Sequence, residues 1–291
     1  MGSSGRIGSY IMRQAEEQNR KLKPLTRTNI HEIGSKYTAK GSPIFICTPG
    51  NAVPDILKHI PVDRIPDLCL ICNGIFSDFF PEKMKHYYRR GVVTCCVPHF
   101  GVLSVGADAI CGPGCPPTVI YGYHSDIIRT LLDLPVPVEV VDSIMEVDTA
   151  AVKKLLWASI LWLFTSDPDN ECPTVKHVHD NLSDQVSALV EELLPAAEAL
   201  VLGCCNDDDD PAKERRKQQL GSSKEVVKYL EAYSYSMHDA TPSLQLALGE
   251  VHERNMKFLN VVDGPPGVQL LHRQMLKRVG VDTNALIFPN R

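Results

Sequence analysis

The stretch that decides the fold is MGSSGRIGSYIM, residues 1–12, because it joins a glycine-rich turn to the start of a helix. In a G-x-G-x-x-G turn the first glycine makes the tight bend. The second lets the backbone approach a pyrophosphate, and the third allows close packing of helix and strand. Gly5 and Gly8 fit the second and third positions, Ser3 occupies the first, and Gly2 lies one residue early. The stretch therefore predicts a phosphate-binding turn at a helix N-terminus.

Short apolar runs alternate with helical or loop segments through the first half of the chain. The expected strands cover residues 22–26, 43–48, 68–72, 92–97 and 136–141. This alternation predicts an α/β fold with a Rossmann-like parallel sheet. Such a sheet needs a central first strand of ~5 residues before the glycine turn. We expect that first strand to be missing, most simply because the start codon is placed too late.

The second half of the chain has helical patterning and lacks strand-like runs. The expected helices cover residues 148–165, 181–202, 224–236, 243–260 and 268–279. We therefore expect two domains, a Rossmann-like domain over 1–142 and an all-helical domain over 143–291.

Composition excludes several classes of protein. The net charge of -5 argues against a nucleic-acid surface, which needs a basic stripe. The most apolar stretch, residues 155–164, is shorter than the ~20 residues of a membrane span. We therefore expect no nucleic-acid partner and no membrane partner.

Ten cysteines occur in the chain, and most of them lie in apolar runs. The spacings Cys69-x-x-Cys72 and Cys111-x-x-x-Cys115 raise the alternative of a zinc site. A zinc site needs four convergent ligands, whereas residues of one strand point to opposite faces. We expect reduced thiols packed as small apolar side chains, and no metal.

Arg27 follows the expected second strand, at the position where NAD-binding proteins place an acidic residue for the ribose. A guanidinium there would pair with a 2′-phosphate, which favours NADP(H) over NAD(H). An ordinary surface arginine is the alternative.

Two helices of the second half carry candidate site residues. Lys154 shares a helix face with small and apolar residues, so it either extends its ammonium to solvent or serves chemistry. Ser243, Glu250 and Arg254 form one polar stripe on a later helix. The alternative for this stripe is a solvated face with a Glu250–Arg254 ion pair.

The chain resembles the ketopantoate reductase family in four stretches that occur in the same order. They are GSSGRIG (2–8), LCLICNGIF (68–76), KKLLW (153–157) and SMHDATPSLQLALGEVHERN (236–255). The likeness extends to a branch of that family in plants, algae and cyanobacteria. It implies an NADPH-dependent reductase with a Rossmann domain and a helical C-terminal domain of the 6-phosphogluconate dehydrogenase type, which serves substrate binding and dimerisation.

The resemblance also implies roles for individual residues. Lys154 would protonate the carbonyl oxygen of a small 2-keto substrate, Glu250 would fix that substrate, and Ser243 and Asn255 would help to bind it. The NADP(H)-binding residues would be Gly2, Ser3, Gly5, Arg6, Ile7, Gly8, Arg27, Thr48 and Asn73. The logic is chemically sound, because hydride addition creates an alkoxide and a desolvated ammonium is a suitable acid for it.

This chain departs from the family pattern at several polar positions. Ala158 stands where the family carries an asparagine, and Asn255 is followed by Met256 where the family has glycine. These losses remove groups that would grip a hydroxylated keto acid, so we expect a small carbonyl substrate other than ketopantoate. The alternative is a catalytically silent nucleotide-binding or interaction protein on the same fold.

The resemblance leaves homodimerisation open. Cytoplasm is the default location, and a truncated start leaves a plastid location open.

Overall fold

The computed structural model describes residues 1–26, 29–33, 39–132, 136–171, 173–203, 210–237, 240–261 and 269–283. The chain divides into two compact units. The first comprises Met1–Cys111 and Cys115–Ala151, and the second comprises Gly112–Gly114 and Val152–Arg291. The division falls inside helix α6 (Ile144–Ser166), whereas the sequence suggested a boundary ahead of that helix, after residue 142.

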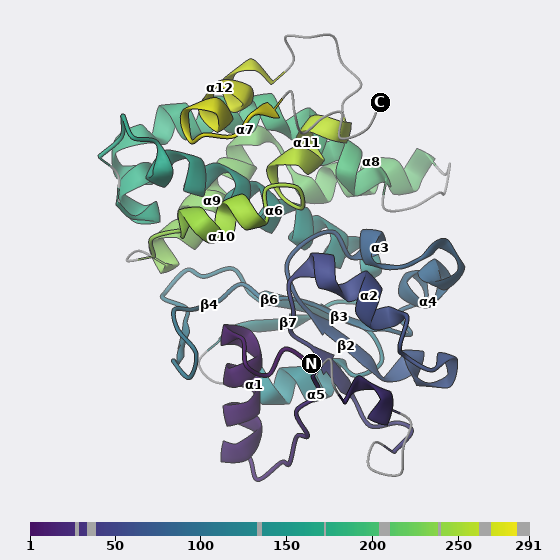
Figure 1. Ribbon diagram of the computed structural model, residues 1–291. Helices are drawn as coiled ribbons and strands as arrows, with labels where there is room; N and C mark the ends of the chain where they lie inside the picture. The colour runs from purple at the N-terminus through teal and green to yellow at the C-terminus, as the bar shows by residue number, and fades with distance from the viewer. Residues whose placement is uncertain are drawn as a thin grey trace. The chain divides into compact units, whose positions relative to one another are not determined.

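The first unit is built on a five-stranded, mostly parallel sheet of order β1-β2-β3-β6-β7 (Figure 1). Its strands are β1 (Ile44–Ile46), β2 (Leu68–Ile71), β3 (Thr94–Val97), β6 (Thr118–Tyr121) and β7 (Val138–Val140). The β1–β2, β2–β3 and β6–β7 pairs are parallel. The α/β class is confirmed, and four of the five expected strands form within their expected ranges.

The sheet is not wholly parallel, which corrects the expectation from the sequence. Strand β6 runs antiparallel to β3, with Cys96 opposite Ile120. Between these strands the chain makes a small hairpin, β4 (Gly101–Val102) with β5 (Ala109–Ile110). Parallel neighbours need a long crossover, usually a helix. Because the hairpin supplies no crossover, the chain re-enters the sheet at the edge where β3 ended, in the opposite direction.

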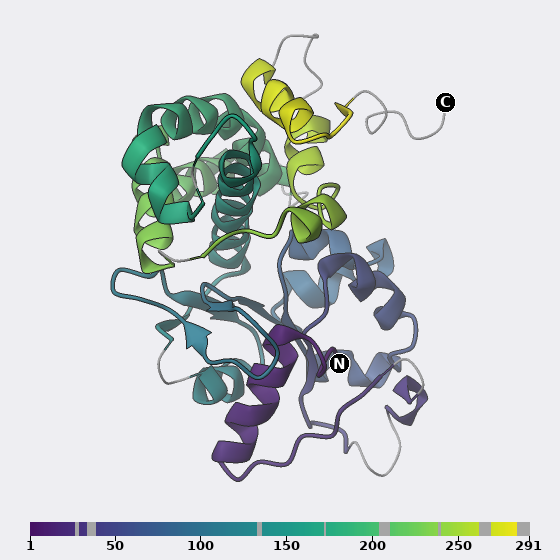
Figure 2. The same ribbon diagram turned by 60° about the vertical axis from the view of Figure 1, so that its left-hand side comes forward.

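Helices cover both faces of the sheet. Helix α1 (Arg6–Glu17) lies beside α5 (Ser125–Leu132), as both views show (Figures 1 and 2). The other helical segments of this unit are short: η1 (Ile30–Glu32), η2 (Gly50–Ala52), α2 (Val53–Leu57), η3 (Val62–Asp67), α3 (Phe76–Phe79), η4 (Glu82–Met84) and α4 (Lys85–Arg89). A two-faced cover of this kind buries β1, β2 and β3 completely, which explains their continuous apolar runs, whereas β7 at the edge of the sheet stays largely exposed.

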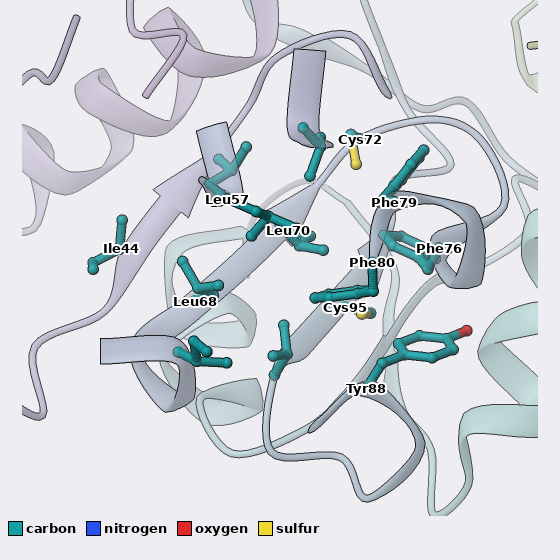
Figure 3. Close-up of a cluster of buried hydrophobic side chains, with 14 of the residues drawn as sticks. Ile44, Leu57, Leu68, Leu70, Cys72, Phe76, Phe79, Phe80, Tyr88 and Cys95 are labelled. Carbon is teal, nitrogen blue, oxygen red and sulfur yellow. The ribbon is translucent and has the colours of Figure 1, made fainter. Parts of the chain in front are cut away.

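The alternation of side chains along a strand divides the core in two. Leu68 and Leu70 of β2 belong to one apolar cluster, together with residues of α2, α3 and α4 such as Leu57 and Phe76 (Figure 3). Cys69 and Ile71 belong to a second cluster, with residues of α1 and α5. Successive side chains of a strand point to opposite faces, so a single strand supplies both cores.

The glycine turn is attached to the edge of β1 through its first residue. The Met1 ammonium donates to the Phe45 carbonyl, and the Cys47 N–H donates to the Met1 carbonyl at 2.9 Å. These two hydrogen bonds are those of one residue in a parallel ladder. No strand precedes α1 in the described part of the chain. The turn nevertheless has a fixed place beside β1.

The strand expected at residues 22–26 does not form. Leu25 is buried in the core, but the segment around it makes no ladder with β1. A strand requires a partner edge as well as apolar residues, and here the backbone of Pro24 and Thr26 hydrogen-bonds to Asn29 instead.

The second unit is a large helical region. Its helices after α6 are α7 (Val175–Gly203), α8 (Asp210–Leu220), α9 (Ser223–Ser236), α10 (Leu244–Gly249), α11 (Asn255–Val261) and α12 (Leu270–Arg278). Helix α7 contacts α8, α9, α11 and α12. Among the described residues, none of the helices combines the length and apolar composition that crossing a membrane requires.

Candidate functional site

The N-terminus of α1 presents uncapped backbone N–H groups. Gly5 occupies the N-cap position in extended conformation, makes no side-chain cap hydrogen bond, and no acidic residue lies in the first turn. The Gly5 N–H itself donates to the Gly2 carbonyl at 3.0 Å, which closes the turn. Uncapped N–H groups and the positive end of the helix dipole together attract anions.

The turn requires glycine at two positions because the backbone passes very close to itself and to β1. A Cβ on Gly8 would lie 2.0 Å from the Gly2 carbonyl oxygen. A Cβ on Gly2, whose φ is +76°, would lie 2.5 Å from the Cys47 carbonyl oxygen. At Gly5 the nearest such contact is 3.3 Å, which a small shift would relieve. The tight bend therefore falls at Gly2, one residue before Ser3.

The carboxyl ends of β1 and β2 contribute Thr48 and Asn73 to the same edge of the sheet. A Cβ on Gly2 would lie 3.0 Å from the Thr48 methyl, so Thr48 adjoins the turn. A Cβ on Gly50 would lie 2.8 Å from the Asn73 carbonyl oxygen, so the two loops touch. Open α/β sheets bind ligands at the carboxyl ends of their strands.

Thr48 carries the polar group at this edge that most needs a partner. Its Oγ1 is buried and makes no hydrogen bond to any described residue. A buried hydroxyl without a partner costs free energy that a bound ligand or a water would recover. Asn73 and Arg6 are exposed, and Ser3 and Ile7 are partly exposed. The edge thus combines backbone donors, one orphaned hydroxyl, an amide and a guanidinium.

Cys47 lies beside the turn and is mostly protonated, so it is a slow nucleophile at neutral pH. Burial raises the pKa of its thiol to about 11, although the nearby Met1 ammonium acts in the opposite direction. The thiol therefore stays protonated at neutral pH and serves as a small apolar neighbour.

Arg27, expected to select the 2′-phosphate of NADP(H), lies outside the described residues.

Lys154 and its neighbour Lys153 occupy different environments on α6. Lys154 is buried, with 9% of its surface exposed. The Lys153 ammonium donates to the Gln219 carbonyl at 2.8 Å, and it lies 5.9 Å from the centre of the Tyr229 ring. Burial lowers the pKa of Lys153, and Glu225 partly opposes that shift. Because Gln219 belongs to the last turn of α8, Lys153 stabilises the C-terminus of that helix.

Ser243 and Glu250 lie at the two ends of α10. Ser243 is the N-cap residue, and its hydroxyl accepts a hydrogen bond from the Leu246 N–H at 3.3 Å. Glu250 is the C-cap residue, and its carboxylate pairs with Arg254. The ion pair expected from the spacing is therefore present, and both groups are partly exposed.

Asn255 is fully buried and all of its side-chain polar atoms are engaged. Its amide nitrogen contacts the Ser159 carbonyl at 3.0 Å and the His272 ring at 2.9 Å. Its amide oxygen accepts from the Trp162 indole at 2.9 Å. Desolvation lowers the pKa of His272 to about 3, with Arg273 adding to the shift, so the ring is neutral. This network joins α6, α11 and α12, and nothing in local spacing marks His272 as its member.

The predicted residues are thus divided between the units. The turn residues with Thr48 and Asn73 belong to the first unit. Lys154, Ser243, Glu250 and Asn255 belong to the second.

Across the described residues no three His, Cys, Asp or Glu side chains gather closely enough to hold a metal ion. Comparison of the chain with protein-family models, with curated proteins and with solved structures found no match.

Proposed function

We propose that the first unit binds NADP(H), with the pyrophosphate at the N-terminus of α1. The observation that supports this most is the packing of the glycine turn against the end of β1. A Cβ at Gly8 or Gly2 would strike backbone oxygen at 2.0 or 2.5 Å. Such a turn fixes the backbone at the start of α1, where uncapped N–H groups could bind a phosphate.

The remaining polar groups of this edge suit the rest of the dinucleotide. The orphaned Thr48 hydroxyl can donate to a phosphate or ribose oxygen. Arg6 adds a positive charge at the helix start, and Asn73 offers an amide for the nicotinamide. Arg27 is proposed for the 2′-phosphate on the sequence alone. When bound, the nicotinamide supplies a hydride.

We further propose that the chain is an oxidoreductase of the ketopantoate reductase type, acting on a small 2-keto compound. Lys154 would donate a proton to the carbonyl oxygen, and Glu250, held by Arg254, would orient the substrate. The burial of Lys154, with 9% of its surface exposed, is the observation that supports this role.

Cofactor binding is tested by titrating the purified chain with NADPH, NADP⁺ and NADH, with nicotinamide fluorescence or calorimetry as the readout. We expect saturable binding of NADPH that is at least tenfold tighter than that of NADH. Absence of saturable binding for all three would refute the proposed site, and a preference for NADH would refute the role of Arg27.

Catalysis is tested with a panel of 2-keto acids and two matched variants, Lys154→Met and Lys153→Met. General acid catalysis contributes about 10²–10⁴-fold, so Lys154→Met should lower kcat by that order while NADPH still binds. Lys153→Met should retain kcat, because Lys153 serves the end of α8.

A catalytically silent nucleotide-binding protein is the second candidate. Ser243 and Asn255 were candidates for substrate binding. Ser243 instead caps a helix and Asn255 is engaged in the core, which favours a protein that binds no substrate there. Saturable NADPH binding with no Lys154-dependent turnover across the panel would select this candidate.

A further inference from the structure

Two cysteine side chains of the first unit meet at one carbonyl group. Cys111 and Cys115 flank a Gly-Pro-Gly sequence between β5 and β6. The Cys115 thiol donates to the His99 carbonyl oxygen at 2.8 Å, and the Cys111 sulfur lies 4.0 Å from the same oxygen. The two thiols also affect each other's pKa. Both sulfur atoms lie within 4.0 Å of the same oxygen atom.

The backbone around the pair holds this arrangement. Gly114 has a φ of +82°, the left-handed conformation that reverses the chain between the two cysteines. His99, which carries the shared carbonyl, is fixed by its ring, which lies 2.7 Å from the Pro117 carbonyl. Its N–H also donates to the Thr118 hydroxyl at 3.0 Å.

Cys111 and Cys115 differ from the cysteines of the central strands. Cys69, Cys95 and Cys96 are completely buried on β2 and β3. Cys111 is only partly buried, whereas Cys115 is 8% exposed. Cys111 is thus the more exposed member of the pair.

We propose that Cys111 and Cys115 form a reversible disulfide by exchange with a small-molecule disulfide such as glutathione disulfide. The Cys111 thiolate attacks one sulfur of glutathione disulfide, forming a mixed disulfide and releasing one glutathione thiolate. Cys115 then loses its proton and attacks the Cys111 sulfur, which forms the Cys111–Cys115 bond and releases the second glutathione. Two electrons pass from the protein thiols to glutathione disulfide, and the two protons end on the two glutathione thiols.

The pH dependence of this exchange follows from the surroundings of Cys111. The hydrogen bond with Cys115, followed by burial, raises the pKa of the Cys111 thiol. Only the thiolate attacks, so the rate should rise about tenfold per pH unit between pH 7 and 9.

The experiment equilibrates the full chain in glutathione redox buffers, alkylates the remaining thiols and maps the tryptic peptides by mass spectrometry. The native chain should show a Cys111–Cys115 bond that forms with glutathione disulfide and disappears with dithiothreitol. Cys111→Ser and Cys115→Ser should each abolish it, whereas Cys47→Ser should retain it.

Two results would overturn the proposal. One is that Cys111 and Cys115 both remain alkylatable in the native chain at excess glutathione disulfide. The other is that a glutathione adduct on Cys111 persists without resolution by Cys115. Both results are measured on the native chain, so they do not depend on the folding of a variant. They also do not depend on nucleotide binding.

Discussion

At the scale of single residues, Gly8 is the most constrained position of the candidate nucleotide site. Gly8→Ala would place a methyl group 2.0 Å from the Gly2 carbonyl oxygen, so the turn must open. Overpacking of this kind costs about 1–3 kcal/mol. We expect NADPH affinity to fall at least tenfold in the titration described above.

Gly203→Ala is the matched control for this prediction. Gly203 ends α7, and among the described residues beyond its own helix no atom lies within 4 Å of a Cβ placed on it. The Gly203→Ala substitution should leave both the affinity for NADPH and the melting temperature unchanged. Equal affinity in the Gly8→Ala and Gly203→Ala variants would contradict the proposed site.

Asn255 shows how one buried amide can stabilise three helices. Asn255→Ala leaves the Trp162 indole N–H and the His272 ring without their partners. An unmade buried hydrogen bond costs about 1–3 kcal/mol, so we expect a loss of about 2–4 kcal/mol in the free energy of unfolding measured in urea. Asn260→Ala, at an exposed position of the same helix α11, should cost far less. Equal losses would show that the network contributes nothing.

At the scale of elements, helix α12 depends on a carboxylate distant in sequence. Glu192 of α7 accepts hydrogen bonds from the Leu271 N–H at 2.9 Å and the His272 N–H at 2.7 Å. Gln269, the N-cap residue of α12, makes no side-chain cap hydrogen bond, so Glu192 performs that function from another helix.

Removal of this carboxylate should loosen α12. Glu192→Ala should cost about 1–2 kcal/mol, the usual value of a helix cap. Hydrogen exchange at residues 271 and 272 should accelerate more than at residues in α9. Glu191→Ala, which changes the exposed neighbouring residue, should leave that exchange unaltered. Unchanged protection in both variants would argue against the cap.

At the scale of the whole molecule, buried neutral histidines make stability depend on pH. Burial lowers the pKa of His272 to about 3 and that of His179 to about 4, from an ordinary value of 6.5. Between the lowered pKa of each folded histidine and the ordinary value of 6.5, the unfolded chain binds more protons than the folded chain. The stabilisation is therefore complete above pH 6.5 and is lost as pH falls from 6.5 toward 3.

The loss should amount to about 6 kcal/mol in the free energy of unfolding between pH 7 and pH 4, roughly half of it from each histidine. Urea denaturation at pH 7, 5.5 and 4 measures it. His272→Gln should reduce this dependence by about half, because glutamine does not titrate and can accept the Asn255 hydrogen bond, while His179 still titrates. His59→Gln, at an exposed position, should not change it. If the free energy of unfolding changed with pH equally in the wild type and in His272→Gln, His272 would not contribute to the pH dependence.

The sequence by itself determined the class of the fold and the need for glycine in its first turn. Apolar runs of strand length alternating with helices predict a buried sheet, and glycines at fixed offsets predict a compressed turn, because both depend on local backbone geometry. The Glu250–Arg254 pair was also predictable, since helical spacing brings such residues together.

Only the tertiary structure decided which polar groups are engaged and which strand edges are paired. The reversal of β6, the lack of a ladder at residues 22–26, the pairing of Met1 with β1 and the burial of Asn255 all depend on contacts between distant residues. A strand forms only where an edge offers hydrogen bonds, and an amide enters a core only where donors and acceptors surround it. Those partners come from elements far apart along the chain, so no local pattern could predict them.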